Sequence, residues 1–300
     1  MSPGRGSTAG VYPLLVVVMA VWGLNIPAVK VLTGVMDTIW VAVGRLLVAC
    51  AVLCLLVLLR DRRWPTLTRR QWAWLAAGGL LMIYANQQLF AAGLARASST
   101  NVSLLMAMTP SMSLVAGSLA FGERVDRRLV AGMLLGFLGV ALAALAAPGA
   151  DVVQPGVGEL LVLLGLLVFV LGGLIVQRLG GELDALTVAW GLYLAGTAML
   201  CLHAGVAGGA GEALAALQAP LVWMCMLYSG VLGTALGNVG WYHAIARIGM
   251  GRAGSLFYLL PIFGVFFSAL LLGESFTTWH AIGLVLVLAG TRLTMRPQQR

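Results

Sequence analysis

Uncharged polar side chains recur inside a long apolar stretch of the sequence. Tyr84, Gln87, Gln88 and Ala91 share one face of a helix that we expect over residues 72–94. In the middle of an apolar helix such groups have no water, so each needs a polar partner. They either line a polar cavity or bond neighbouring helices to one another, an interaction worth about 0.6 kcal/mol on average. The cavity interpretation makes Tyr84 and Gln88 candidate substrate-binding residues.

Two further helices place candidate ligands at a similar depth. Trp22 lies near the centre of the helix expected over 12–33, where an indole N–H favours a polar partner or a cavity. Asn238 is the best candidate in the helix expected over 220–243. Trp241 lies nearer the end of that helix, where we expect it to anchor the chain at a membrane interface.

Arg45 is a cation about two turns, roughly 12 Å, inside the end of an expected helix over 38–59. A guanidinium at that depth costs about 2.5 to 3.5 kcal/mol on insertion scales unless it meets water or an anion. All ten acidic residues lie in expected loops or at helix ends, so no buried acidic partner is evident. Arg45 therefore either attracts a substrate carboxylate or is a structural residue bonded to carbonyls, water or Asp37.

The same distribution of acids argues against a mid-membrane carboxylate that carries a coupling proton. Glu159 is the one weak candidate for such a site. If the chain moves a solute across a membrane, this distribution predicts movement that is facilitated or sensitive to membrane potential rather than driven by protons.

Pro110 and Pro261 occupy the middle of two apolar helices. Each removes a backbone donor, so both helices should kink and expose a carbonyl one turn earlier, near Met106 and Phe257. The paired kinks serve either as hinges that line a cavity or as static bends for packing. Tyr258, beside the second kink, is a further candidate ligand.

The sequence holds no pattern typical of catalysis or metal binding. Its three histidines lie on different expected helices without the spacing of a metal motif, and no nucleophile elbow is present. The four cysteines lie inside apolar segments, which favours packing over disulfides or zinc. We therefore expect no enzyme activity, no cofactor and no bound metal.

Composition indicates the elements that must position these residues. The 300 residues are 61% hydrophobic and 9% charged, which leaves too few charges to cover a soluble globule. Apolar runs of the length that crosses a bilayer recur along the whole chain. The predicted spans are 12–33, 38–59, 72–94, 99–121, 128–146, 157–178, 185–206, 220–243, 250–272 and 277–295.

The arginines indicate how these ten helices are oriented. Five of them lie between Arg60 and Arg70, and most others fall on the same side if the N-terminus is cytoplasmic. The net charge of +8 thus reflects topology and predicts no nucleic-acid partner. We expect a multi-pass protein of the cell inner (plasma) membrane with both termini in the cytoplasm.

The chain also repeats itself internally. A shift of 151 positions aligns Pro110 with Pro261 and Glu123 with Glu274, and a shift of 147 aligns the earlier parts. The halves are 1–148 and 149–300. Each holds five expected helices, an odd number, so equivalent helices cross the membrane in opposite directions. Such inverted repeats suit alternating access around a midplane site, although duplication retained for packing is the alternative.

Short motifs carry a resemblance to a known family. The run from Trp22 through Asn25 to Pro27, with Lys30 and later Arg45, resembles the opening of EamA-domain proteins of the drug/metabolite transporter superfamily. The segments from each central proline to a Gly-Glu pair, Gly122-Glu123 and Gly273-Glu274, resemble the close of such a domain.

This resemblance implies two EamA-like five-helix repeats, with a cavity formed mainly by the first four helices of each. It makes Trp22, Asn25 and Arg45 substrate-binding candidates. Phe169, Gln177 and Leu192 stand in the second half where Trp22, Lys30 and Arg45 would align, so we expect any contribution of these three first-half residues to be asymmetric. Many bacterial members export amino acids or related metabolites.

The sequence as a whole predicts an all-α integral membrane protein of ten helices in two inverted repeats. Its predicted function is export of amino acids or related small metabolites by alternating access. The alternatives are a channel or a lipid-handling protein and, with less support, an intramembrane enzyme.

The expected partners of the protein are a small-molecule substrate and the bilayer. We expect a monomer or a homodimer formed through the helices at 128–146 and 277–295. Glycines on those two helices suit either dimerisation or packing within the chain.

Overall fold

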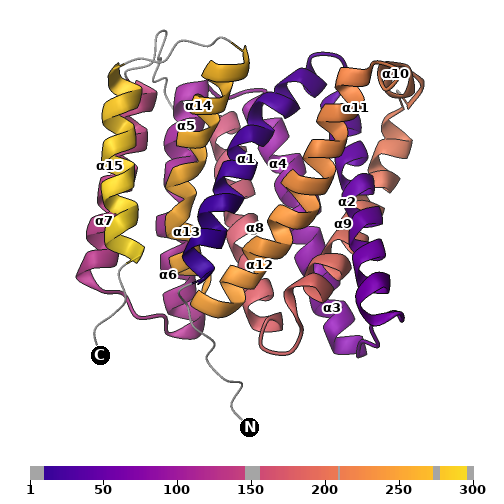
Figure 1. Ribbon diagram of the computed structural model, residues 1–300, viewed down its shortest axis with the longest axis horizontal. Coiled ribbons are helices and arrows are strands. Elements are labelled where there is room, and N and C mark those ends of the chain that lie inside the picture. Colours follow the sequence, from indigo (N-terminus) through magenta and orange to yellow (C-terminus); the bar gives the residue numbers. More distant parts are fainter. Residues whose placement is uncertain (1–9, 146–155, 209, 273–277, 296–300) are drawn as a thin grey trace.

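The computed structural model describes residues 10–145, 156–208, 210–272 and 278–295, and these are helical apart from short connections (Figure 1). The elements are α1 (Val11–Thr33), α2 (Thr38–Asp61), α3 (Arg69–Gly78), η2 (Gly79–Ala85), α4 (Asn86–Leu94), α5 (Ser99–Ala107), α6 (Thr109–Phe121), α7 (Arg127–Leu145), α8 (Val157–Leu179), α9 (Ala185–Ala207), α10 (Ala210–Ala216), α11 (Pro220–Leu227), η3 (Tyr228–Leu236), α12 (Gly237–Ile248), α13 (Met250–Gly254), η4 (Ser255–Tyr258), α14 (Leu259–Leu272) and α15 (Thr278–Met295).

Eight helical stretches of the described residues are long and apolar enough to cross a membrane. Two predicted spans, 72–94 and 277–295, are outside this set. The first is an unbroken helical stretch from α3 to α4 that carries the polar residues of the predicted stripe. The second, α15, has a shorter apolar part, Ala281–Thr294. The protein is therefore an all-helical, multi-pass membrane protein.

Several helices depart from regular α-geometry in their middle, which the sequence analysis did not predict in full. Segments η2 and η3 are π-helical, and a shift of 151 moves η2 onto residues 230–236, inside η3. The helix around Pro110 is interrupted at Met108, and a 3-10 turn, η4, ends three residues before Pro261. Irregular turns inside membrane helices are a frequent feature of functional sites.

The helices form two bundles that are built from equivalent helices of the internal repeat. In the first bundle, α1 packs against α14, α12 and η3; in the second, α8 packs against α6, α4 and η2 (Figure 1). Between them α2 contacts α9, and these two also contact η3 and η2 respectively. At the edge of the molecule α7 and α15 lie side by side.

Glycines bring α7 and α15 into backbone contact. A Cβ added to Gly139 would lie 2.7 Å from the carbonyl oxygen of Gly283, and one added to Gly132 would lie 2.6 Å from that of Gly290. Side chains at these positions would separate the helices. The small-residue faces are therefore used for packing within the chain, one of the two roles expected of them.

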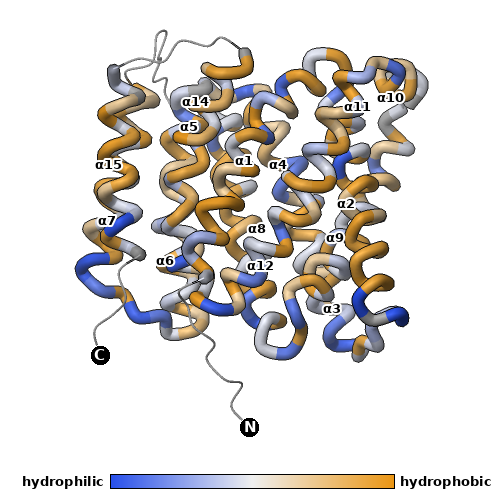
Figure 2. Tube along the Cα trace, in the orientation of Figure 1, coloured by the Kyte–Doolittle hydropathy of each residue, from blue (hydrophilic) through white to orange (hydrophobic). Residues whose placement is uncertain are grey.

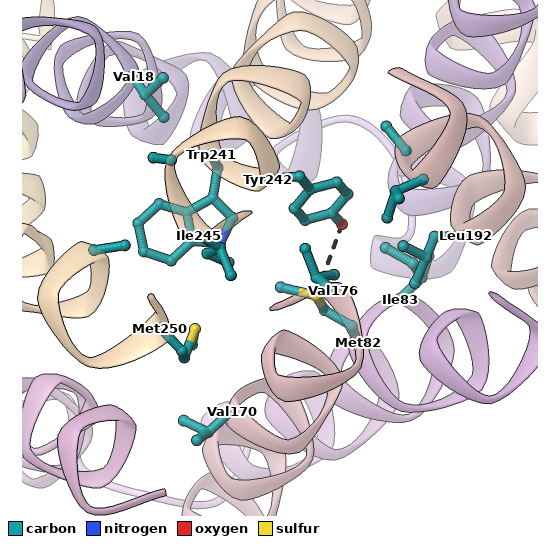
Figure 3. Close-up of a cluster of buried hydrophobic side chains, with 14 of the residues drawn as sticks. Val18, Met82, Ile83, Val170, Val176, Leu192, Trp241, Tyr242, Ile245 and Met250 are labelled. Carbon is teal, nitrogen blue, oxygen red and sulfur yellow. Dashed lines mark hydrogen bonds between the residues drawn. The ribbon is translucent and has the colours of Figure 1, made fainter. Parts of the chain in front are cut away.

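Large side chains fill the centre of the molecule (Figure 3). Trp241 and Tyr242 on α12 are at most 1% exposed, and the Tyr242 hydroxyl donates to Sδ of Met82 at 3.7 Å. The prediction that Trp241 anchors a helix end at the interface is therefore wrong. Because α12 continues to Ile248, Trp241 lies two turns from the helix end and packs inward.

Hydrophilic residues gather most densely at the end of the molecule drawn lowest in Figure 2. We call it the arginine-rich end; it contains the end of α2, the start of α3, the end of α8 and the loop after α12. Here Arg60 of α2 bonds Asp184, the N-cap of α9. Burial alone would raise the pKa of Asp184, but hydrogen bonds from Arg60 and Thr187 outweigh it and lower that pKa. The carboxylate therefore stays charged and ties α2 to α9.

Candidate functional site

Four aromatic rings from four membrane helices meet near the centre of the molecule. Trp22 of α1 lies 5.7 Å from Trp241 of α12 and 5.8 Å from Phe257 of η4, measured between ring centroids. Trp241 and Phe257 are 4.7 Å apart, and Phe169 of α8 meets Phe257 edge-on at 5.6 Å. These rings offer apolar surface and π-faces, which attract apolar groups and cations.

The polar side chains of α1 face the π-helical segment η3. The indole N–H of Trp22 donates to the carbonyl of Gly233 at 2.7 Å. Asn25, one turn further along, lies so close to η3 that a Cβ on Gly233 would be 2.9 Å from its Cγ. The side-chain oxygen of Asn25 is enclosed and accepts no hydrogen bond from the described residues. An unsatisfied buried acceptor is costly unless a ligand or water supplies the donor.

Arg45 of α2 contacts the same segment through its backbone. Its carbonyl oxygen is 3.1 Å from the position of a Cβ on Gly230, one turn before Gly233 in η3. The guanidinium Nε is enclosed and makes no hydrogen bond to the described residues. Asp37, the acid offered as a structural partner, instead caps α2 by accepting from the Ile39 amide at 2.9 Å. The electrostatic neighbour of Arg45 is the hydroxyl of Tyr193 on α9.

The remaining predicted ligands divide into two groups. Asn238 lies two residues beyond η3 and donates to the carbonyl of Thr234, within η3, at 2.8 Å. It therefore adjoins the segment that Asn25 and Arg45 contact. Tyr84 belongs to η2 in the second bundle, where its hydroxyl lies 3.4 Å from Nδ1 of His203. Gln88 is partly exposed on α4.

Tyr258 is placed differently. It is 3% exposed, and its ring packs against Gly136 of α7, toward the edge of the molecule. This packing argues against its predicted contact with a substrate. Sequence reasoning chose it because it adjoins a central proline, but the 3-10 turn of η4 directs Phe257 rather than Tyr258 to the aromatic cluster.

We define the central site as Trp22, Asn25, Trp241 and Phe257, and we add Arg45 because its backbone contacts the same segment, η3. Trp241 and Phe257 were not predicted as ligands. Their sequence signals are weak, since aromatic residues in apolar helices are usually core residues, and only the fold shows that they meet Trp22.

An apolar pocket lies apart from the central site. It has a volume of about 290 Å³ and lies between α2, α10 and α11 at the end opposite the arginine-rich end. Its walls include Trp40, Leu47, Leu214 and Trp223, without a charged residue. The pocket lacks the groups that would recognise a polar metabolite.

The two ends of the bundles are packed unequally. At the arginine-rich end α13 packs on α6, and α8 packs on α12 and α13. The internal repeat pairs these contacts with others at the opposite end. Within the described residues, no comparable contact joins α5 to α14, the equivalent of α13 with α6. None joins α1 to α4 or α5, the equivalents of α8 with α12 and α13. The exposure of equivalent side chains shows the same inequality, since Leu259 is 3% exposed whereas Met108, at the equivalent position of the repeat, is 43% exposed.

Comparison with known families and proteins decides the class of protein. The family described as "EamA-like transporter family" matches residues 10–145 and, a second time, residues 156–296. The chain belongs to this family. Its membership makes the protein a membrane transporter, as the resemblance of the Trp22 and Gly122-Glu123 motifs predicted.

Relatives within the family cover nearly the whole chain. "Uncharacterized transporter YetK" of Bacillus subtilis is 22% identical over 95% of this chain and 87% of its own length. A Streptantibioticus cattleyicolor protein named "Probable terminal-alkyne amino-acid exporter" is 27% identical over 94% of this chain and 92% of its own. A crystal structure with 18% identity covers 96% of this chain and 97% of its own at a TM-score of 0.77, which shows the same fold.

Proposed function

We propose that this EamA-family transporter exports amino acids or closely related small metabolites that carry a carboxylate. The observation that carries the proposal is the pair of enclosed, unsatisfied polar atoms, Nε of Arg45 and Oδ1 of Asn25, on two helices that flank η3. One is a cationic donor and the other a neutral acceptor. The relative named as an amino-acid exporter supports the same substrate class.

The chemistry of an amino acid fits these groups one by one. Its carboxylate pairs with the Arg45 guanidinium through charge-assisted hydrogen bonds. Its ammonium donates to Oδ1 of Asn25 and meets the π-face of Trp22, which is only partly buried. An apolar or aromatic side chain packs against the same rings. Binding of this kind gives partners to Nε of Arg45 and Oδ1 of Asn25, which donate or accept no hydrogen bond among the described residues.

We also propose that ten helices form two inverted repeats, 1–148 and 149–300, which exchange conformations to move the substrate. The second match of the family, the equivalent positions of η2 and η3, and the matching make-up of the two bundles support this arrangement. With the arginine-rich end in the cytoplasm, the unequal packing of the two ends corresponds to an outward-facing state. Alternating access then requires a second state with the packing exchanged.

A thermal-shift screen of the purified protein tests the substrate class. Apolar and aromatic amino acids are expected to raise the melting temperature, since a ligand at 100 times its Kd stabilises the folded state by about 2.7 kcal/mol. Phenylalaninamide, which lacks the carboxylate, and 3-phenylpropionate, which lacks the ammonium, are matched controls and should each give a smaller shift. Equal shifts for all three, or shifts only with organic cations, would contradict the proposal.

Reporter tags test the inverted topology. A tag after Arg300 or within residues 61–70 should be cytoplasmic, and a tag near residue 151 or 210 should be periplasmic. This pattern follows from an odd number of helices in each half and from the arginines between Arg60 and Arg70. Protease protection or enzymatic reporters in intact cells give the answer. A cytoplasmic tag at 210 would refute the inverted repeat.

A further inference from the structure

Glu123, in the loop after α6, is bonded to two other segments of the protein. Its Oε1 accepts a hydrogen bond from Nε2 of Gln177, in the last turn of α8, at 2.9 Å. Its Oε2 accepts from the backbone N–H of Gly251, at the start of α13, at 3.1 Å. Oε1 of Gln177 in turn accepts from the Met250 amide at 2.8 Å. Three hydrogen bonds therefore join α6, α8 and α13 at the arginine-rich end.

These bonds replace the cap that α13 lacks. Gly249 precedes the helix with φ +85 and has no side chain to accept from the first amides. A residue with a Cβ is strained at that φ. The amides of Met250 and Gly251 are instead satisfied by side chains from a different bundle. Because the cap is supplied from outside, α13 cannot move away from α6 and α8 without breaking these hydrogen bonds.

Glycines surround the carboxylate so that it can approach closely. A Cβ on Gly117 of α6 would lie 2.7 Å from Cδ of Glu123, and a Cβ on Gly251 would lie 2.6 Å from Oε2. Gly249 is equally close to the carboxylate. The surrounding backbone thus leaves room for this one carboxylate. The segments that it joins are far apart in the sequence and are brought together by the fold.

The bonded segments belong to opposite bundles. α13 continues through η4 into α14, which packs on α1 in the first bundle, whereas α6 and α8 belong to the second. The contacts of α13 with α6, and of α8 with α12 and α13, are those that have no comparable equivalent at the other end within the described residues. Glu123 and Gln177 therefore lie where the two bundles are closed against each other.

We propose that Glu123 and Gln177 form a latch that holds the arginine-rich end closed in this state and must open for the opposite state to form. The latch rests on the alternating-access part of the proposed function. Its loss shifts the equilibrium toward the state in which this end is open. The loss of one charge-assisted hydrogen bond corresponds to about a tenfold change in the ratio of the two states.

Distances between spin labels measure this ratio. In a variant without the native cysteines, one label pair replaces Phe121 and Arg247, exposed residues of opposite bundles at the latched end. A second pair replaces Val35 and Ala95, exposed residues at the other end. Each pair is measured in lipid nanodiscs in the wild-type, Glu123→Gln and Gln177→Leu backgrounds. Glu182→Gln, which removes an acid at the same end outside the latch, is the matched control.

We expect Glu123→Gln and Gln177→Leu each to increase the ratio of long to short distances for the first pair about tenfold, with the opposite change for the second pair. Glu182→Gln should leave both ratios unchanged. Two wild-type populations whose ratio neither latch variant alters would overturn the latch and leave alternating access intact. A single unchanging distance in the wild type, with and without amino acids, would instead contradict alternating access and the latch with it.

Discussion

Replacing Arg45 with glutamine is expected to weaken binding of a carboxylate-bearing substrate about 10- to 100-fold while the protein still folds. A hydrogen bond to a charged group is worth about 1.5 to 3 kcal/mol, and each 1.4 kcal/mol changes Kd tenfold. Arg45 makes no ion pair with a described acid, so the substitution orphans no carboxylate. It also removes the cost of holding an unpaired cation inside the membrane, which favours folded yield.

Two further variants separate substrate binding from a structural role. Arg45→Lys keeps the charge but loses the planar fork and should bind with intermediate affinity. Arg247→Gln removes an exposed arginine at the end of α12 and is the matched control, expected to bind like the wild type. Isothermal titration with the amino acid that gives the largest thermal shift provides Kd. Unchanged affinity in folded Arg45→Gln would exclude Arg45 from the site and favour the structural alternative.

Much of the helical framework could be predicted from sequence because membrane helices follow local rules. The apolar run at 38–59 became α2, which begins after the N-cap Asp37 and ends at Asp61. The repeat register likewise predicted which positions are equivalent, and η2 and η3 lie within it. Length, hydropathy and capping are properties of single segments, so no knowledge of the tertiary fold is needed.

The composition of the site could be predicted only in part. Trp22 and Arg45 were chosen because polar groups deep in apolar helices need partners, and Asn25 was chosen from the family resemblance. Trp22 and Asn25 lie close to η3, and Arg45 contacts η3 through its backbone. Trp241 and Phe257 were missed because their contacts join helices more than two hundred residues apart in the chain. The direction of a side chain at a helix irregularity, as at Tyr258, depends on turn geometry that hydropathy does not encode.

The conformational state was also beyond sequence reasoning. Because the sequence repeats, the residues at the two ends of the molecule follow the same pattern. Only the fold shows that α6, α8 and α13 are joined at one of these ends. Glu123 was visible as part of a Gly-Glu motif, but its bonds to Gln177 and Gly251 connect segments from both halves.

A pH gradient is not expected to drive transport, because of where the acidic side chains of the described residues lie. Glu159 is buried, and its carboxylate already accepts from Asn101 Nδ2 at 2.9 Å and from the Gly156 amide at 2.9 Å. These bonds cap the start of α8, so protonation would break a structural contact. The central site contains no acid. A carboxylate that carries a proton across would have to be reached from both sides in turn, whereas the described acids lie in loops or near helix ends.

Counterflow in proteoliposomes tests the central claim most directly. Vesicles containing the protein are loaded with unlabelled amino acid and diluted into a trace of the labelled form, with and without a pH gradient. An alternating-access carrier with this site should accumulate label transiently and saturably, by more than tenfold over empty vesicles, and Arg45→Gln should need a correspondingly higher concentration. The pH gradient alone should give no accumulation. Absence of saturable counterflow for every amino acid that binds would contradict the carrier mechanism, and strong accumulation driven by the pH gradient alone would contradict its uncoupled form.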